Sequence, residues 1–168
     1  GRDATYFARS GWLGTTGLAP AVWAGDQRTD FQADDGLPSV VAMGIGYGAS
    51  GVPVFTHDVA GYQSLTNDPS TKELWFRWAG LGAYSPIYRL HHGSATDQNH
   101  QWDSDEETKA YYAATTREHM RLWPYRYGLA RRAAEQGIPM VMPVAFVHGG
   151  EDWGRKDAWM LGDALLVA

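Results

Sequence analysis

The sequence predicts an α/β fold of four parallel βα units followed by a long C-terminal helix, in a single domain spanning 1–168. Two observations carry this prediction: four short apolar runs end in polar residues, and helical patterns lie between and after these runs. The 44% of hydrophobic and 20% of charged residues are ordinary for one globular domain. Four such strands make either an open sheet or half of an eight-stranded barrel.

The four apolar runs have the length of short buried strands. The segment 11–20, which joins the first two runs, is short for a crossover helix, and we expect it to be mostly loop. Parallel strands bring their carboxyl ends to one rim, where functional residues gather. Polar residues that close the runs, Arg9, Asp26, Asp58 and His91, are therefore expected to share that rim. The runs are 5–8, 21–24, 52–56 and 87–90.

Three helices are expected after the second, third and fourth runs. The first enters at 35–38, with a proline in its first turn, and ends near residue 50. The second opens at Asp68, which has the character of an N-cap. The third and longest runs from about Glu106 to Gln136, and Pro124 should kink it because proline interrupts the helical hydrogen bonds.

Composition excludes several classes of function. The net charge of −5 argues against nucleic acid as a partner, because phosphate binding needs a basic surface. The sequence contains no run of about 18 apolar residues, so no membrane span is expected. It also contains no cysteine, which rules out disulfides and zinc–thiolate sites. A cytoplasmic location is the simplest expectation. The 8 Trp and 9 Tyr suit a carbohydrate site, but they suit a well-packed core as well.

No cofactor or metal is expected. His57, His91 and His92 together with Asp58 form a histidine-rich group that a metal hydrolase would also need. However, the paired-histidine spacing of a helical zinc motif is absent from the sequence.

At Val22-Trp23-Ala24-Gly25-Asp26 the sequence resembles glycoside hydrolase family 31, and six later strings agree with that family in order and spacing. The resemblance covers essentially the whole chain, and the register of the strings makes it specific. The six strings are SGVPVFTHDVAGY at 50–62, KELWFRW at 72–78, YSPIYRLH at 84–91, LWPYRYGLA at 122–130, GIPMVMP at 137–143 and MLGDALLVA at 160–168.

The resemblance implies a glycosidase acting on α-linked sugars or aryl α-glycosides, and it assigns roles to individual positions. Asp26 matches the family's general acid/base at the end of barrel strand six. Asp58 is the second catalytic candidate, and other positions match groups that contact the sugar or support the site. This substrate-binding set comprises Arg9, Trp23, His57, Tyr62, Arg77, Trp78 and His91.

The resemblance also implies what lies outside the sequence. The chain is similar to strands five to eight of the family's (β/α)8 barrel plus its last helix. The family's nucleophile is an aspartate at the end of strand four, which corresponds to a position upstream of Gly1. The string at 25–39 and Tyr62 resemble the bacterial branch that includes sulfoquinovosidases, in which the matching tyrosine helps to hold the sulfonate of the substrate. Sulfoquinovosidase-type specificity is therefore an alternative to α-glucosidase-like specificity.

The chemistry leaves two interpretations of the carboxylates open. A retaining glycosidase needs two carboxyls about 5–5.5 Å apart, whereas roughly 6.5–9.5 Å suits an inverting enzyme. Asp26 as the acid and Asp58 as a base acting through water would fit the inverting case. Alternatively, Asp58 accepts hydrogen bonds from sugar hydroxyls, or the chain is a non-catalytic sugar-binding or structural half-barrel.

A half-barrel leaves two strand edges unpaired. Unpaired edges and an uncovered apolar face favour association. We therefore expect a homodimer that forms through the exposed strand edges.

Overall fold

The computed structural model describes residues 5–64, 68–150 and 153–168, and its N-terminal part is a three-stranded parallel sheet. The strands lie in the order β1 (Phe7–Ala8), β2 (Ala21–Trp23) and β3 (Phe55–Thr56). Val22 of β2 pairs with Ala8 on one side and with Phe55 on the other. The first three predicted strands are thus confirmed, although each is shorter than its apolar run.

The prediction of a fourth parallel strand at 87–90 is wrong. In the described chain this segment contributes a single bridge, between Leu90 and Val59. The reason lies in the segment after β3, with which a strand at 87–90 would have to pair. After Asp58, Ala60 and Gly61 adopt left-handed backbone conformations, with φ of 68° and 80°, which turn the backbone out of the direction of β3. The fold therefore does not contain the four parallel βα units that the sequence predicts.

The helices follow the strands largely as predicted. α1 (Leu37–Ala49) begins with a proline in its first turn, and the β1–β2 connection is a loop containing only the short 3₁₀ turn η1 (Thr15–Gly17). α2 (Lys72–Ala83) starts later than predicted. Its N-cap is Thr71, whose side chain accepts a hydrogen bond from the amide of Leu74 at 3.2 Å.

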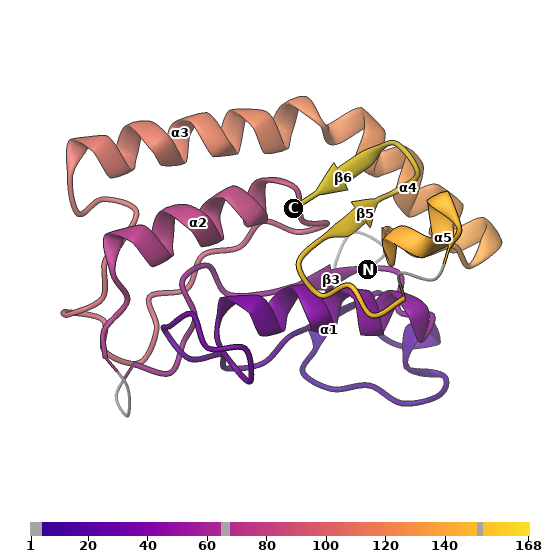
Figure 1. Cartoon of the computed structure of the whole chain (residues 1–168), viewed down its shortest axis with the longest axis horizontal. Coiled ribbons are helices and arrows are strands. Elements are labelled where there is room, and N and C mark those ends of the chain that lie inside the picture. The colour runs from indigo at the N-terminus through magenta and orange to yellow at the C-terminus, as the bar shows by residue number, and fades with distance from the viewer. Residues whose placement is uncertain (1–4, 65–67, 151–152) are drawn as a thin grey trace.

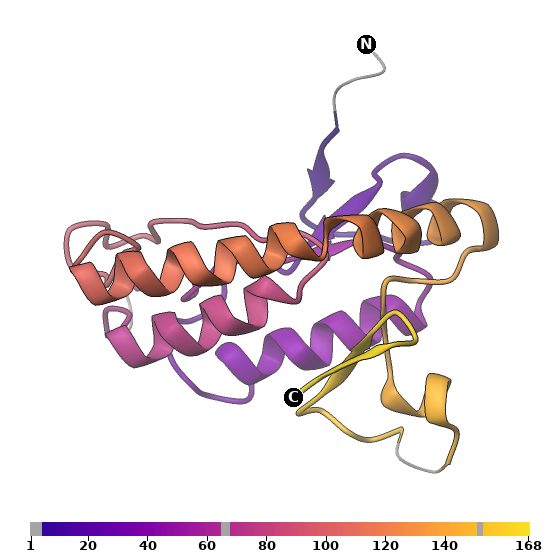
Figure 2. The ribbon, with the colours of Figure 1, turned by 90° about the horizontal axis from the view of Figure 1, so that it is seen from above.

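The long C-terminal helix is interrupted as predicted. α3 (Glu106–Arg121) and α4 (Trp123–Gln136) are separated at Leu122, and Pro124 occupies the first turn of α4, where its missing N–H costs nothing. Figure 2 shows the two helices running one after the other along the molecule, with α3 lying over α2.

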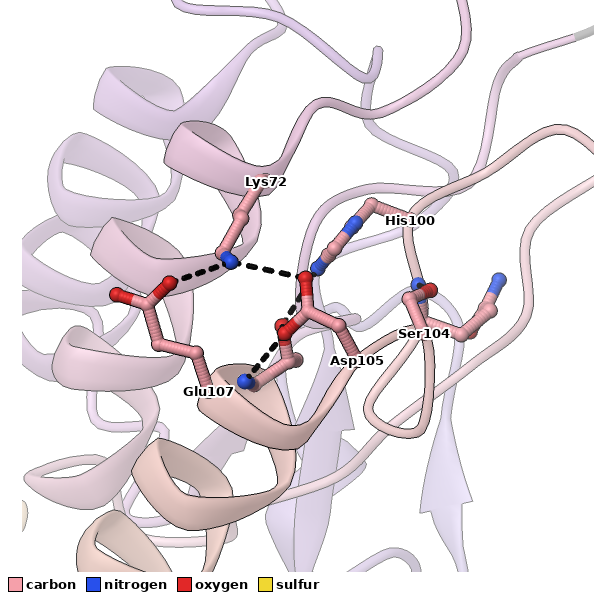
Figure 3. Close-up of polar contacts among 7 residues, drawn as sticks. Lys72, His100, Ser104, Asp105 and Glu107 are labelled. Atoms are coloured by element: carbon pink, nitrogen blue, oxygen red, sulfur yellow. Dashed lines mark hydrogen bonds and ion pairs between the residues drawn. The ribbon is translucent and has the colours of Figure 1, made fainter.

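An ion-paired cluster fastens the first turn of α3 to the first turn of α2 (Figure 3). The amine of Lys72 lies 2.8 Å from a carboxylate oxygen of Asp105 and 2.6 Å from one of Glu107. Asp105 also caps α3, because it accepts hydrogen bonds from the amide and the hydroxyl of Thr108. These contacts hold the pKa of Asp105 well below its usual range, the Lys72 hydrogen bond being the largest cause.

The C-terminal part forms a second sheet that the sequence analysis did not predict. β4 (Val141–Met142), β5 (Trp159–Leu161) and β6 (Leu165–Val167) are antiparallel, and the short helix α5 (Val144–His148) lies between the first two. The sheet packs beside α1, as Figure 1 shows. Gly48 permits this contact, because a Cβ there would come within 2.0 Å of the Val141 carbonyl oxygen.

Two apolar clusters hold these layers together. One joins β3 to α2 and is built around Phe55, Trp75 and Trp78, which are at most 2% exposed. The other joins the C-terminal sheet to α4 and contains Trp159 and Leu129. No helix within the described ranges is long and apolar enough to cross a membrane.

Candidate functional site

Asp26 lies at the carboxyl end of β2, where the sequence predicts a functional rim. Gly25 turns the chain there with a φ of 99°, a conformation that suits glycine. The Asp26 side chain is 19% exposed, so it is accessible without projecting into bulk solvent. A guanidinium nitrogen of Arg9, from the end of β1, donates to its carboxylate at 3.1 Å. The structure thus brings these two predicted site residues together.

The ring of Trp23 packs against both Arg9 and Phe7. The Arg9 guanidinium carbon lies 5.0 Å from the centroid of the Trp23 ring, which is cation–π distance. The Phe7 ring meets the same indole edge to face, with centroids 6.3 Å apart. The indole Nε1 of Trp23 is buried and has no hydrogen-bond partner among the described residues. It is therefore a donor available to a bound molecule.

Asp58 belongs to the same group but is fully buried. One of its carboxylate oxygens, Oδ1, is ion-paired with Arg89, while Oδ2 has no hydrogen-bond partner within the described chain. Burial raises the pKa of the Asp58 carboxyl, whereas the positive charges of Arg89 and His91 act in the opposite direction. The charge of Asp26 adds to the upward shift, so the two carboxylates are close enough to repel each other.

Arg89 is the site residue that the sequence analysis did not select. Its guanidinium lies over the rings of both Phe7 and Trp23, at 5.0 and 5.4 Å from their centroids. The available signal was its position near the carboxyl end of the fourth run, 87–90, two residues before His91 at the predicted rim. Arg89 was missed because a strand was expected at 87–90. The alternation of side chains along a strand did not indicate that Arg89 would face the site.

Tyr62 and His91 lie together beside this group. Their rings meet edge to face, with centroids 5.0 Å apart. The Tyr62 amide donates to the Gln27 carbonyl at 2.8 Å, which fixes Tyr62 next to the segment that carries Asp26. His91 is exposed, and its charge acts on Asp58. Both residues therefore extend the site along its rim.

His57 and Trp78 are placed elsewhere, in the core between β3 and α2. The Trp78 indole donates to Nδ1 of His57 at 3.0 Å, and Nε2 of His57 lies 2.7 Å from the Ser85 hydroxyl. Both ring nitrogens are occupied, and both residues are 0% exposed. Burial lowers the pKa of His57 to about 3. Both side chains are therefore engaged in the core and not in the rim group.

Arg77 also lies apart from the rim group. Its side chain is 64% exposed on α2 and pairs with Glu73 one turn earlier, at 2.9 Å. It borders a hollow of about 710 Å³ between α1, α2 and β6, together with Asp157.

The rim group consists of Asp26, Asp58, Arg9, Arg89, Phe7 and Trp23. It offers one accessible carboxyl, one buried carboxylate whose Oδ2 has no hydrogen-bond partner among the described residues, and four aromatic or cationic supports. A carboxyl able to exchange a proton beside unpaired hydrogen-bonding groups is suited to acid/base chemistry on a polyhydroxylated ligand. Within the part of the chain that the structure describes, no cluster of three or more histidine and carboxylate side chains is arranged to hold a metal ion.

Comparison with known proteins gives a consistent result. The model of the glycosyl hydrolases family 31 TIM-barrel domain matches residues 1–129. A sulfoquinovosidase of Agrobacterium fabrum is 33% identical over 168 residues, and one of Escherichia coli is 34% identical over 166 residues. These alignments cover 99% and 97% of the chain but only 25% and 24% of the relatives.

A solved structure of a family 31 sulfoquinovosidase from E. rectale, in complex with an aza-sugar inhibitor, superposes with a TM-score of 0.95 at 32% identity. The match covers 99% of this chain and 25% of that chain. The chain thus spans about a quarter of the length of these three proteins.

Proposed function

Because this chain belongs to glycoside hydrolase family 31, we propose that it supplies the proton-donating side of α-glycoside hydrolysis, with Asp26 as the general acid/base. The observation that carries the proposal is the placement of Asp26 at the rim, partly exposed and bonded to Arg9 at 3.1 Å. In the proposed step Asp26 gives its proton to the glycosidic oxygen while the bond from that oxygen to the anomeric carbon breaks. The leaving alcohol carries the proton away.

We assign Asp58 to substrate binding rather than to activation of water. Its side chain is fully buried and its Oδ1 is held by Arg89, which leaves Oδ2 as an acceptor for a sugar hydroxyl. The proposal places the nucleophile outside the 168 residues, as the family resemblance implies. The partner that attacks the anomeric carbon is then a group from another part of the protein or an added small anion.

The test uses the 168-residue chain with aryl α-glycosides and azide, which replaces the missing nucleophile. Azide attacks the anomeric carbon from the face opposite the leaving group, so the product is a β-glycosyl azide together with the phenol. Asp26→Asn should lower phenol release by about 10²- to 10⁴-fold for a poor leaving group, the usual contribution of general acid catalysis. It should change release of 2,4-dinitrophenol little, because that group departs without a proton.

Asp34→Asn is the matched control, because Asp34 is an exposed carboxylate that also pairs with an arginine, Arg28, at 3.2 Å. It should leave both rates unchanged. Equal release by wild type and Asp26→Asn from the poor leaving group would refute the acid role. Sugar binding without azide-dependent turnover would favour a non-catalytic binding role.

A second candidate concerns the substrate: sulfoquinovosidase-type specificity. The names of the two relatives and of the solved structure support it, as does the position of Tyr62 against His91 at the edge of the rim group. An aryl α-sulfoquinovoside should react faster than the matching α-glucoside, and Tyr62→Phe should reduce this preference. A preference for the glucoside would support α-glucosidase-like specificity instead.

We also propose that the chain self-associates through the open edge of β1. Phe7 and the preceding Tyr6 are 40% and 59% exposed, which places apolar surface beside an edge that no strand of the described residues covers. A strand from a second copy would cover both.

A further inference from the structure

Arg89 contacts three members of the rim group, as many as Trp23 does. Its guanidinium is ion-paired with Oδ1 of Asp58 and lies over the rings of Phe7 and Trp23. Its side chain is 22% exposed, so most of it is enclosed by these neighbours. One cation thus connects β1, β2 and the segment after β3.

The contact with Asp58 leaves a defined acceptor. Oδ1 is engaged, while Oδ2 is buried and lacks a hydrogen-bond partner in the described residues. Buried polar atoms are rarely left unpaired, because an unmade hydrogen bond costs free energy that water or a ligand would recover. Nε1 of Trp23, under the same guanidinium, is a donor that also has no partner in the described part of the chain. The hydroxyl groups of a sugar can both accept from such a donor and donate to such an acceptor.

We propose that Arg89 is a positioning residue, which fixes the Asp58 carboxylate so that Oδ2 accepts a hydroxyl of the bound sugar. This inference rests on the proposed function of the site. Arginine suits the role because its planar guanidinium stacks on aromatic rings while its edge faces a carboxylate. Lysine offers a charge of similar sign but neither the plane nor the fixed directions of the N–H groups.

The first experiment is a double-mutant cycle on sugar affinity. The ¹⁵N-labelled chain is titrated with 4-nitrophenyl α-D-glucopyranoside, or with the α-sulfoquinovoside if that binds more tightly, and NMR shifts give Kd. Arg89→Met and Asp58→Asn should each weaken binding by about tenfold, roughly one hydrogen bond. The double variant should bind no more weakly than Asp58→Asn alone, because Arg89 acts through Asp58. If the loss of affinity in the double variant equals the product of the losses in the two single variants, the proposal is overturned.

The second experiment needs no sugar, so it separates this inference from the proposed function. Carboxyl ¹³C NMR follows the titration of Asp58, whose carboxyl is influenced by Arg89, His91 and Asp26. Arg89→Met should raise the pKa of Asp58, because an attractive charge and a hydrogen bond are lost. Arg89→Lys should restore part of the shift, but it should not restore sugar affinity.

Arg132→Met is the matched control, because Arg132 is 25% exposed and pairs with Asp163 at 2.9 Å, away from the rim. It should change neither the Asp58 titration nor Kd, and melting temperatures identify any variant that fails to fold. An unchanged Asp58 titration in folded Arg89→Met would overturn the positioning role. Failure of the wild-type chain to bind either sugar would refute the proposed function, and the titration would still test the Arg89–Asp58 contact.

Discussion

His57 and Asp58 are neighbours in the sequence, yet they serve different parts of the molecule. Successive side chains at a strand end point to opposite sides. His57 therefore bonds to Trp78 and Ser85 in the core, while Asp58 meets Arg89 in the rim group. Both are 0% exposed. Burial disfavours the charged form of each, which is why His57 is neutral and Asp58 depends on a cation beside it.

The buried neutral state of His57 predicts acid sensitivity. Its pKa is lowered from 6.5 to about 3 on folding, so the unfolded chain binds the proton more readily between these values. Stability from this group is complete above pH 6.5 and is lost as the pH falls towards 3. The free energy of unfolding should drop by about 2 kcal/mol between pH 7 and pH 5 from His57 alone. Urea denaturation at the two pH values measures it.

The comparison variant is His57→Gln, which keeps a hydrogen-bonding side chain but does not titrate. It should be less stable than wild type at pH 7, yet should lose about 2 kcal/mol less between pH 7 and pH 5. His148→Gln, a change at an exposed histidine, should follow the wild-type curve. An identical pH dependence for wild type and His57→Gln would contradict the neutral buried histidine.

At the residue scale, the sequence predicted the carboxylates better than their partners. Asp26, Arg9 and Asp58 were identified by position after apolar runs and by family resemblance, and Trp23 by the resemblance alone. The structure places the four in one group. Which arginine pairs with which carboxylate was not predictable. Such pairs join residues 17 and 31 positions apart, so they depend on strand register and on the turn after Asp58.

Among the elements, α1 is the one whose glycines have the clearest meaning. Gly44 and Gly48 are buried one turn apart, against the Trp159 ring and the Val141 carbonyl, whereas Gly46 is exposed with nothing near its Cβ position. Gly44 and Gly48, which lower the helix propensity of this segment, are therefore what lets the C-terminal sheet lie against α1.

This difference predicts opposite effects for the same substitution. Gly46→Ala should stabilise the chain by about 0.5–1 kcal/mol, because alanine favours the helix and no neighbour obstructs it. Gly48→Ala should destabilise it by about 1–3 kcal/mol, because the new methyl group would force α1 away from β4. Chemical denaturation measures both. Equal and stabilising effects would show that α1 and β4 are not in contact.

At the element scale, the sequence predicted the helix boundaries that single residues determine. The break near Pro124 and the end of α4 at Gly137, with a φ of 72°, follow from the properties of single residues. The C-terminal sheet was not predicted, although its strands are as short as the three strands of the parallel sheet that were predicted. Their pairing with one another and their packing on α1 come from tertiary contacts.

For the whole molecule, the main feature is that both sheets are small and have open edges. The parallel sheet ends at β1 and the antiparallel sheet ends at β6, where Leu166 is 54% exposed. Strand edges with nearby apolar side chains favour pairing with another chain. The sequence predicted unpaired edges from the half-barrel resemblance, although it placed one of them at 87–90, where no strand forms.

The proposed self-association is testable by size-exclusion chromatography with light scattering. The wild-type chain should have about twice the mass of a single chain. Tyr6→Lys should shift it to the monomer, because a lysine beside β1 disfavours edge pairing. Leu13→Lys is the control, since Leu13 is 92% exposed in the loop rather than at a strand. A compact wild-type monomer would refute the proposal.

Asp26 is held by Arg9, and Arg9 follows the two-residue edge strand β1. Short edge strands are among the first parts of a protein to open locally, and their amide protons exchange early. Each such opening would carry Arg9 away and release the carboxylate. Any chain segment that pairs with β1 would therefore slow hydrogen exchange at Phe7 and Ala8. By keeping Arg9 in place, it would also restrict the orientations of the Asp26 carboxylate on the neighbouring strand.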